Sequence, residues 1–82
     1  MIVKMFVQDS CPNCPNTKAL GKELINQGLN VEFFDVKTPE GLAESLMFDV
    51  LTTPSTIVLK KEKVVDKFLG NTPEIGDVKK WC

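Results

Sequence analysis

The chain of 82 residues is 43% hydrophobic, so it can form one small domain, 1–82, with a modest core and has no room for a second. Ten basic and eleven acidic residues leave a formal net charge of −1, which argues against nucleic acid or a membrane surface as a partner. No apolar run approaches the roughly 18 residues of a membrane span, and the start of the chain lacks the basic and long apolar regions of a signal peptide. We therefore expect a cytoplasmic protein, and we expect it to act as a monomer.

The N-terminal part of the chain is typical of a strand, a helix and a second strand. Residues 2–8 are mostly apolar and rich in β-branched side chains, which predicts a buried strand. A helix is predicted from about Pro12 to Gln27, and Gly28 is suited to end it. Residues 31–36 predict the second strand. The apolar face expected on the helix consists of Ala19, Leu20, Leu24 and Ile25.

The rest of the chain predicts a helix, a hairpin and a final helix. Thr38-Pro39-Glu40 supplies a capping hydroxyl, a proline suited to the first helical position and an acid in the first turn. Residues 56–59 and 64–69 favour two strands joined by a lysine-rich turn, and Thr72-Pro73-Glu74 repeats the pattern of a helix start. The apolar positions expected on the two helices are Leu42, Leu46, Met47 and Val50 in the first and Ile75, Val78 and Trp81 in the second.

The predicted order of elements is βαβαββα. Its first half requires a parallel pair of strands joined by a crossover helix, and its second half requires an antiparallel hairpin. The sequence therefore predicts an α/β protein with a mixed four-stranded sheet and three helices packed on it.

Cys11-Pro12-Asn13-Cys14 lies where the first predicted strand gives way to the first predicted helix. A thiol at a helix N-terminus faces unpaired backbone N–H groups and the positive end of the helix dipole, and both favour the thiolate. A second thiol one turn later is close enough to attack a mixed disulfide formed on the first. The spacing predicts thiol–disulfide exchange without a cofactor, with Cys11 attacking, Cys14 resolving, and Pro12 and Asn13 beside the substrate.

A metal site is the competing interpretation, because Cys-Pro-x-Cys also occurs as half of a zinc site. Zinc takes four ligands, whereas this chain has three cysteines and no histidine. A zinc or iron–sulfur site would therefore have to be shared between two chains through Cys11 and Cys14. Cys82, the last residue, has no second pair beside it and is most simply an exposed tail thiol, so we favour redox chemistry and expect no metal. A third class, an interaction module of the same fold without catalysis, would normally lack an intact Cys-x-x-Cys.

With Thr52-Thr53-Pro54-Ser55 before the third predicted strand, the pattern resembles the thioredoxin/glutaredoxin superfamily over essentially the whole chain. The resemblance implies the thioredoxin fold and a cis-proline loop that lies against the active-site disulfide. Pro54 matches that proline, and Thr53 before it would hold the substrate backbone by β-type pairing. The short chain, the Cys-Pro-x-Cys motif and Pro15 are similar to small glutaredoxin-like redoxins of archaea and anaerobes.

The chain departs from the family's patterns at positions that bear on its electron donor. Thioredoxins usually carry tryptophan directly before the first cysteine and a buried acid six residues before it, where this chain has Ser10 and Met5. Asp9 places negative charge where the carboxylates of glutathione would dock. The resemblance implies protein or low-molecular-weight disulfides as substrates. We expect a flavoprotein of the thioredoxin-reductase type to be the better donor and glutathione the weaker one.

Overall fold

The computed structural model describes residues 1–9 and 11–82, and over these residues it contains seven elements in the order βαβαββα. This is the order predicted from the sequence. No helix among the described residues is long and apolar enough to cross a membrane. The elements are β1 (Ile2–Val7), α1 (Cys14–Asn26), β2 (Asn30–Asp35), α2 (Pro39–Met47), β3 (Ser55–Lys60), β4 (Lys63–Leu69) and α3 (Ile75–Lys79).

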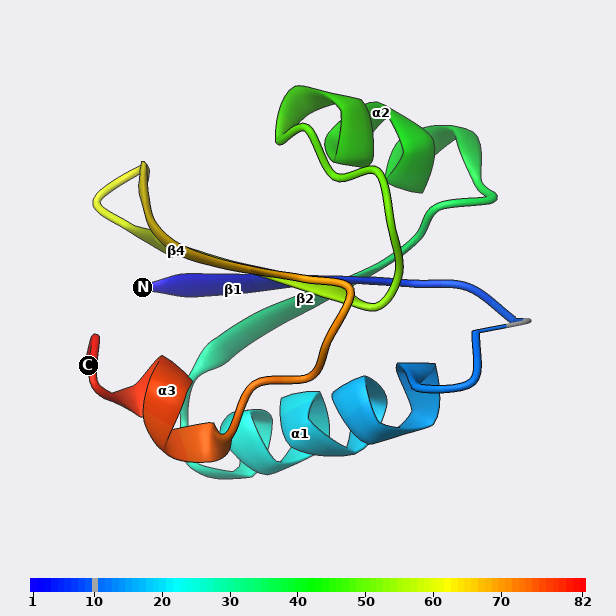
Figure 1. Ribbon diagram of the computed structural model, residues 1–82. Helices are drawn as coiled ribbons and strands as arrows, with labels where there is room; N and C mark the ends of the chain where they lie inside the picture. Colours follow the sequence, from blue (N-terminus) through cyan, green and yellow to red (C-terminus); the bar gives the residue numbers. More distant parts are fainter. Residues whose placement is uncertain (10) are drawn as a thin grey trace.

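The four strands form one mixed sheet in the order β2-β1-β3-β4. β1 pairs in parallel with β2 and antiparallel with β3, and β3 and β4 form the predicted hairpin. Figure 1 shows α1 and α3 on one face of this sheet and α2 on the other. The predicted fold class, a thioredoxin fold with three helices on a mixed four-stranded sheet, is confirmed.

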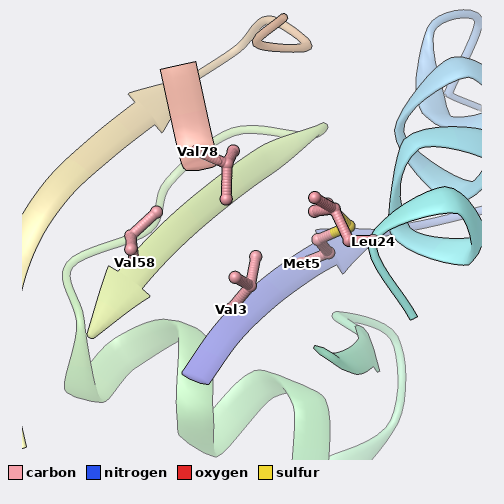
Figure 2. Packing of buried hydrophobic residues seen from close by; sticks show 5 residues of the cluster. All are labelled: Val3, Met5, Leu24, Val58 and Val78. Atoms are coloured by element: carbon pink, nitrogen blue, oxygen red, sulfur yellow. The ribbon is translucent and has the colours of Figure 1, made fainter. Parts of the chain in front are cut away.

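Alternating side chains of β1 divide the core into two clusters, one on each face of the sheet. Val3 and Met5 point toward α1 and α3, where they meet Leu24, Val58 and Val78 (Figure 2). Phe6 points to the opposite face, where it packs with Val50, Ile57 and Leu59 near α2. Each face of this central strand is thus buried, which accounts for the mostly apolar sequence of β1, in which Lys4 is the single charged residue.

Lys4 joins α2 to the sheet on this second face. Its Nζ lies 2.5 Å from a carboxylate oxygen of Glu44 on α2 and 3.4 Å from one of Glu32 on β2. The same ammonium group lies 5.2 Å from the ring centroids of Phe34 and Phe48. A charged side chain is therefore accommodated inside the layer between α2 and the sheet because carboxylates and aromatic faces both contact it.

Local hydrogen bonds and turn geometry explain where α2 begins and where the hairpin turns. The Thr38 hydroxyl accepts the Gly41 N–H at 3.0 Å, which confirms the predicted cap of α2. Lys61 and Glu62 form the two-residue turn of the hairpin, and both have positive φ, as a type I′ turn requires.

The third helix begins later than predicted. It starts at Ile75, and Thr72 does not cap it, because the Thr72 hydroxyl lies 2.7 Å from that of Thr17 on α1. Glu74 is the N-cap residue, and its N–H donates to the Asp77 carboxylate at 3.1 Å.

The apolar face predicted for α2 is wrong for the helix itself. The helix buries Gly41 and Ser45 and leaves Leu42, Leu46 and Met47 exposed, whereas Val50, beyond the helix, is buried as predicted. A Cβ on Gly41 would overlap the carbonyl oxygen of Asp35, so α2 lies too close to the end of β2 for a larger side chain to face inward. Because α2 packs on the sheet through the small residues Gly41 and Ser45, Leu42 and Leu46 lie on its outer side.

Candidate functional site

Cys11 and Cys14 form a disulfide, with their Cα atoms 5.3 Å apart. Both side chains lie in a small apolar cluster with Val7, the last residue of β1. Both residues are buried, and Cys11, at 7% exposed, keeps slightly more contact with solvent than Cys14, at 1%.

The helix that follows starts at Cys14, two residues later than predicted. Asn13 is its N-cap residue, and Cys11 precedes the helix instead of beginning it. The cause is Pro15: it has no N–H, so the helical bond to the Cys11 carbonyl cannot form, and that carbonyl accepts the Cys14 N–H at 3.4 Å instead. Pro12 and Asn13 form the exposed turn between the two sulfurs.

The start of α1 still favours negative charge near the disulfide. No acidic residue occupies its first turn, so no side-chain charge there opposes the positive end of the helix dipole. The Thr17 N–H donates to the Asn13 carbonyl, whereas the N–H of Asn16 has no backbone acceptor within the described part of the chain. An anion at the start of α1 would therefore be favoured by the positive end of the helix dipole.

The Thr53–Pro54 peptide bond is cis, as the family resemblance implies. Pro54 is fully buried, and the antiparallel register pairs Ser55 with Phe6, which sets Pro54 opposite Val7 at the motif end of β1. Thr53 and Gln8 line the same cavity, so the proline loop lies beside the segment that leads into the motif. The fold therefore brings both sequence-predicted loops to one edge of the sheet.

Backbone contacts hold this loop to its neighbours. The Gly70 N–H donates to the Pro54 carbonyl at 2.9 Å, and the Ser55 hydroxyl donates to the Thr52 carbonyl at 2.7 Å. Ser55 is thus a local hydrogen-bond donor that shapes the loop, and it was not predicted as a site residue.

Two further buried polar side chains, Thr17 on α1 and Thr56 on β3, were not predicted from the sequence. Thr17 is fully buried one turn after Cys14, and its hydroxyl pairs with that of Thr72 in the loop between β4 and α3. Thr56 is also fully buried, and its hydroxyl has no hydrogen-bond partner among the described residues. Threonine is common in strands and helix starts, so neither residue stood out by its type or spacing.

The remaining cysteine lies far from the motif. Figure 1 places the C-terminus beside α3, at the opposite end of the molecule from the loop that leads into α1. Cys82 is exposed and unpaired there. Within the described residues no group of three or more histidine, cysteine, aspartate or glutamate side chains is arranged to hold a metal ion. Asp9 is exposed beside the motif, and Ser10 lies outside the described residues.

Two comparisons with known proteins, one of sequences and one of solved structures, both find thioredoxins, whereas no protein-family model matches the chain. A probable thioredoxin of Archaeoglobus fulgidus is 26% identical over 80 residues, which cover 96% of this chain and 82% of that protein. A thioredoxin H-type of Brassica campestris is 32% identical over 74 residues, but this chain spans only 60% of its length. The structure of thioredoxin 1 from Thermosipho africanus matches with a TM-score of 0.70 and 28% identity, covering 95% of this chain and 85% of that one.

Two cysteines that form a disulfide at the start of a helix, next to a cis-proline loop at the same edge of the sheet, are typical of proteins that catalyse thiol–disulfide exchange. The protein is a thiol–disulfide oxidoreductase of the dithiol redoxin kind, a protein-disulfide reductase. In sequence and fold the chain is similar to thioredoxins, which are members of the thioredoxin/glutaredoxin superfamily. The relatives named above are thioredoxins, so the narrower likeness to small glutaredoxin-like redoxins stays a prediction.

Proposed function

We propose that Cys11 attacks disulfides of polypeptide or low-molecular-weight substrates and that Cys14 resolves the mixed disulfide. The observation that carries this assignment is a small difference in exposure between two buried residues, because Cys11 keeps 7% of its surface exposed and Cys14 only 1%. A substrate sulfur can therefore approach Cys11 first. The open turn of Pro12 and Asn13 leaves that side of the disulfide accessible to a substrate.

The exchange balances in two steps. The Cys11 thiolate attacks one sulfur of the substrate disulfide, forms a mixed disulfide and releases the other substrate sulfur as a thiolate. The Cys14 thiolate then attacks the Cys11 sulfur, closes the Cys11–Cys14 disulfide and releases the second substrate thiolate. Two electrons pass from the protein dithiol to the substrate, and solvent protonates the released thiolates. In this proposal Thr53 and Pro54 position the substrate backbone beside Cys11.

Selective alkylation and single cysteine variants test these roles. Substoichiometric iodoacetamide should label Cys11 before Cys14 in the reduced protein, as peptide mass spectrometry can show. Cys11→Ser should abolish reduction of a disulfide-bonded peptide, whereas Cys14→Ser should accumulate a mixed disulfide visible in the intact mass. Cys82→Ser is the matched control and should change neither result, since Cys82 lies at the other end of the molecule. Faster labelling of Cys14 would reverse the assignment.

We propose a flavoprotein reductase of the thioredoxin-reductase type as the electron donor, with glutathione as a weaker one. Asp9 is exposed next to the motif and would repel the two carboxylates of glutathione. A donor of this kind operates in a reducing compartment such as the cytoplasm, which is where we place the protein.

Charge reversal tests the donor. Asp9→Lys should raise the rate of reduction by glutathione, and more so at low salt, because salt screens charges on the surface. Glu62→Lys makes the same charge change in the hairpin turn, far from the motif, and should leave that rate unchanged. Efficient reduction of the wild-type disulfide by glutathione would contradict the proposal.

A further inference from the structure

β2 is an outer strand of the sheet and pairs with β1 alone among the described residues. The Val36 N–H, directly after β2, donates to the Val7 carbonyl of β1 at 3.1 Å. Successive residues of a strand direct their backbone groups to alternate sides, so Val31, Phe33 and Asp35 direct theirs away from β1. An outer strand of this kind presents backbone groups that can pair with another chain.

The two outer strands of the sheet differ in how strongly they discourage such pairing. β4 carries Lys63, Asp66 and Lys67, and a register shift interrupts its pairing with β3. Charged side chains, lysine above all, and bulges are the means by which natural proteins protect an outer strand. β2 contains no lysine or proline, and its register with β1 continues from end to end without a shift. β2 is therefore the outer strand suited to pairing.

Apolar side chains lie exposed beside this strand. Phe33 is 40% exposed, and its ring packs over Gly21 of α1, where a Cβ would come within 2.4 Å of a ring carbon. Ile25 lies one turn further along the same side of α1 and is 46% exposed. A partner strand that brings its own apolar side chains to this place would remove both from water.

A second copy of the chain fits this edge by symmetry. Two copies of β2 related by a two-fold axis perpendicular to the sheet are antiparallel, and a residue at the axis lies opposite itself. With Phe33 at the axis the two rings would face each other, and the Phe33 N–H and C=O groups would form two reciprocal hydrogen bonds. The Asp35 N–H of each copy would then reach the Val31 carbonyl of the other, which adds two more.

The neighbouring registers are less favourable. With Glu32 at the axis, two carboxylates would lie directly opposite each other, which destabilises a strand pair. With Phe34 at the axis, Phe33 would lie opposite Asp35, whose carbonyl already accepts the backbone N–H and the hydroxyl of Thr38. The Phe33 register avoids both problems, because it places each acid of the strand opposite an apolar residue.

The helices on this face of the sheet would also meet. α1 packs on β1 through Leu24 and on β2 through Gly21, so its axis lies above the gap between these strands. Because neighbouring strands are spaced evenly, the two copies of α1 would lie about 10 Å apart across the axis, a distance typical of packed helices. The two four-stranded sheets would thus join into one, with a pair of helices across its centre.

We propose that the protein forms a symmetric dimer in which β2 of one copy pairs antiparallel with β2 of the other, with Phe33 at the two-fold axis. One strand and one helix from each copy make a small interface, at or below about 1,200 Å², so association is reversible, with a Kd of about 1–100 µM. The chain is a monomer, as its sequence predicts, only below that concentration. The two β1 strands run in opposite directions, so the two disulfides lie at opposite ends of the joined sheet and both stay accessible.

Sedimentation and hydrogen exchange of the disulfide-bonded protein test the dimer. Cys82→Ser is introduced throughout, so that the exposed tail thiol cannot cross-link two chains. Sedimentation velocity from about 1 to 500 µM should show monomer giving way to dimer. Over the same range, exchange of the Phe33 and Asp35 amides, followed by NMR, should slow by about ten-fold or more.

The other outer strand supplies the control for exchange. The Gly70 N–H donates to the Pro54 carbonyl, so the Leu69 amide before it faces the open side of β4. Exchange of the Leu69 amide should therefore be fast at every concentration.

Substitutions at the axis test the register. Phe33→Lys and Phe33→Glu each place two like charges opposite each other, and each should raise the Kd of the dimer by about ten-fold or more. An equimolar mixture of the two variants should dimerise, because residue 33 then faces the opposite charge. Val64→Lys is the matched control: Val64 is also 40% exposed but lies on β4, so the Kd should not change. Exchange in the chain with phenylalanine at position 33 decides the question if either axis variant fails to fold.

Each other outcome overturns the proposal. A monomer over the whole concentration range, or equal weakening of the dimer by Val64→Lys and Phe33→Lys, would show that β2 is not the interface. A dimer with an unprotected Phe33 amide, or folded axis variants that do not associate when mixed, would assign the contact to another surface or register. None of these measurements uses a disulfide substrate, so their failure would leave the proposed function unchanged.

Discussion

Thr56→Val should stabilise the protein. The substitution replaces a buried hydroxyl with a methyl group and leaves the size of the side chain almost unchanged. The Thr56 hydroxyl is fully buried on the face of the sheet covered by α1 and α3 and has no hydrogen-bond partner in residues 1–9 and 11–82. Its cross-strand neighbours are Met5 and Phe68, both apolar. Valine has nearly the same shape and needs no partner.

The expected gain follows from the cost of an unpaired hydroxyl. Burying such a group without a partner costs about 1–3 kcal/mol, and the methyl group that replaces it buries well in apolar surroundings. We expect the free energy of unfolding to rise by about 1–2 kcal/mol. For a domain of this length each 1 kcal/mol shifts Tm by about 4–8 °C.

Urea unfolding of the disulfide-bonded protein measures this change. Trp81, the single tryptophan, packs against the core and donates from its indole nitrogen to Asp66 at 3.1 Å, so its fluorescence should report unfolding. The unfolding midpoint should increase with an unchanged slope, because the amount of surface exposed on unfolding hardly changes.

Thr17→Val is the matched control, and it should lower the free energy of unfolding where Thr56→Val raises it. Thr17 is as buried as Thr56, but its hydroxyl lies 2.7 Å from that of Thr72. Losing that hydrogen bond should lower the free energy of unfolding by about 0.5–1.5 kcal/mol. If Thr56→Val destabilises the protein as much as Thr17→Val does, the Thr56 hydroxyl has a partner in solution and the reasoning fails.

Three further predictions concern the packing of α2 on the sheet. Glu44→Gln should lower the free energy of unfolding by about 1–3 kcal/mol, because Lys4 keeps its charge between α2 and the sheet with one partner fewer. Burial lowers the pKa of Lys4, but the hydrogen bond and charge of Glu44 outweigh it and hold the pKa above its ordinary value of 10.5. Wild-type stability measured by denaturation should therefore be retained below pH 10.5 and fall as the pH rises through that higher pKa, with a smaller fall in Glu44→Gln. Gly41→Ala should lower the free energy of unfolding by about 3 kcal/mol or more, because its Cβ would overlap the Asp35 carbonyl. Gly76→Ala, in open space on α3, should raise the free energy of unfolding by about 0.5–1 kcal/mol. Equal effects of the two substitutions in thermal unfolding would contradict the close packing of α2.

Local signals predicted the strands, the hairpin and one helix start well. Thr38 caps α2 because its hydroxyl is available to the Gly41 N–H. At α3 the same threonine-proline-glutamate pattern does not begin the helix, since Thr72 pairs with Thr17 from a distant part of the chain. A cap is thus predictable only where no tertiary contact competes for the side chain.

The Cys-x-x-Cys pair was predictable in position, but the relation of Cys11 to the helix was not. Pro15 removes one helical hydrogen bond, which moves the helix start to Cys14 and leaves Cys11 in the preceding turn. The cis-proline loop was predicted from the family resemblance alone, because no local feature of the sequence marks the Thr53–Pro54 bond as cis. The cavity beside it could not be predicted, since its wall combines residues from α2 with the loop that follows.

The outward leucines of α2 show why periodicity alone does not identify a buried face. An apolar stripe predicts only that the helix contacts something apolar, and in this chain Gly41 and Ser45 give a second face that packs more closely on the sheet. Glu44 on that inner side pairs with Lys4, which fixes the rotation of the helix about its axis. Leu42 and Leu46 are then directed toward the cavity at the redox edge. Gly41, Ser45 and Glu44 thus make the contacts that hold α2 on the sheet, and the apolar stripe of the helix faces away from the core.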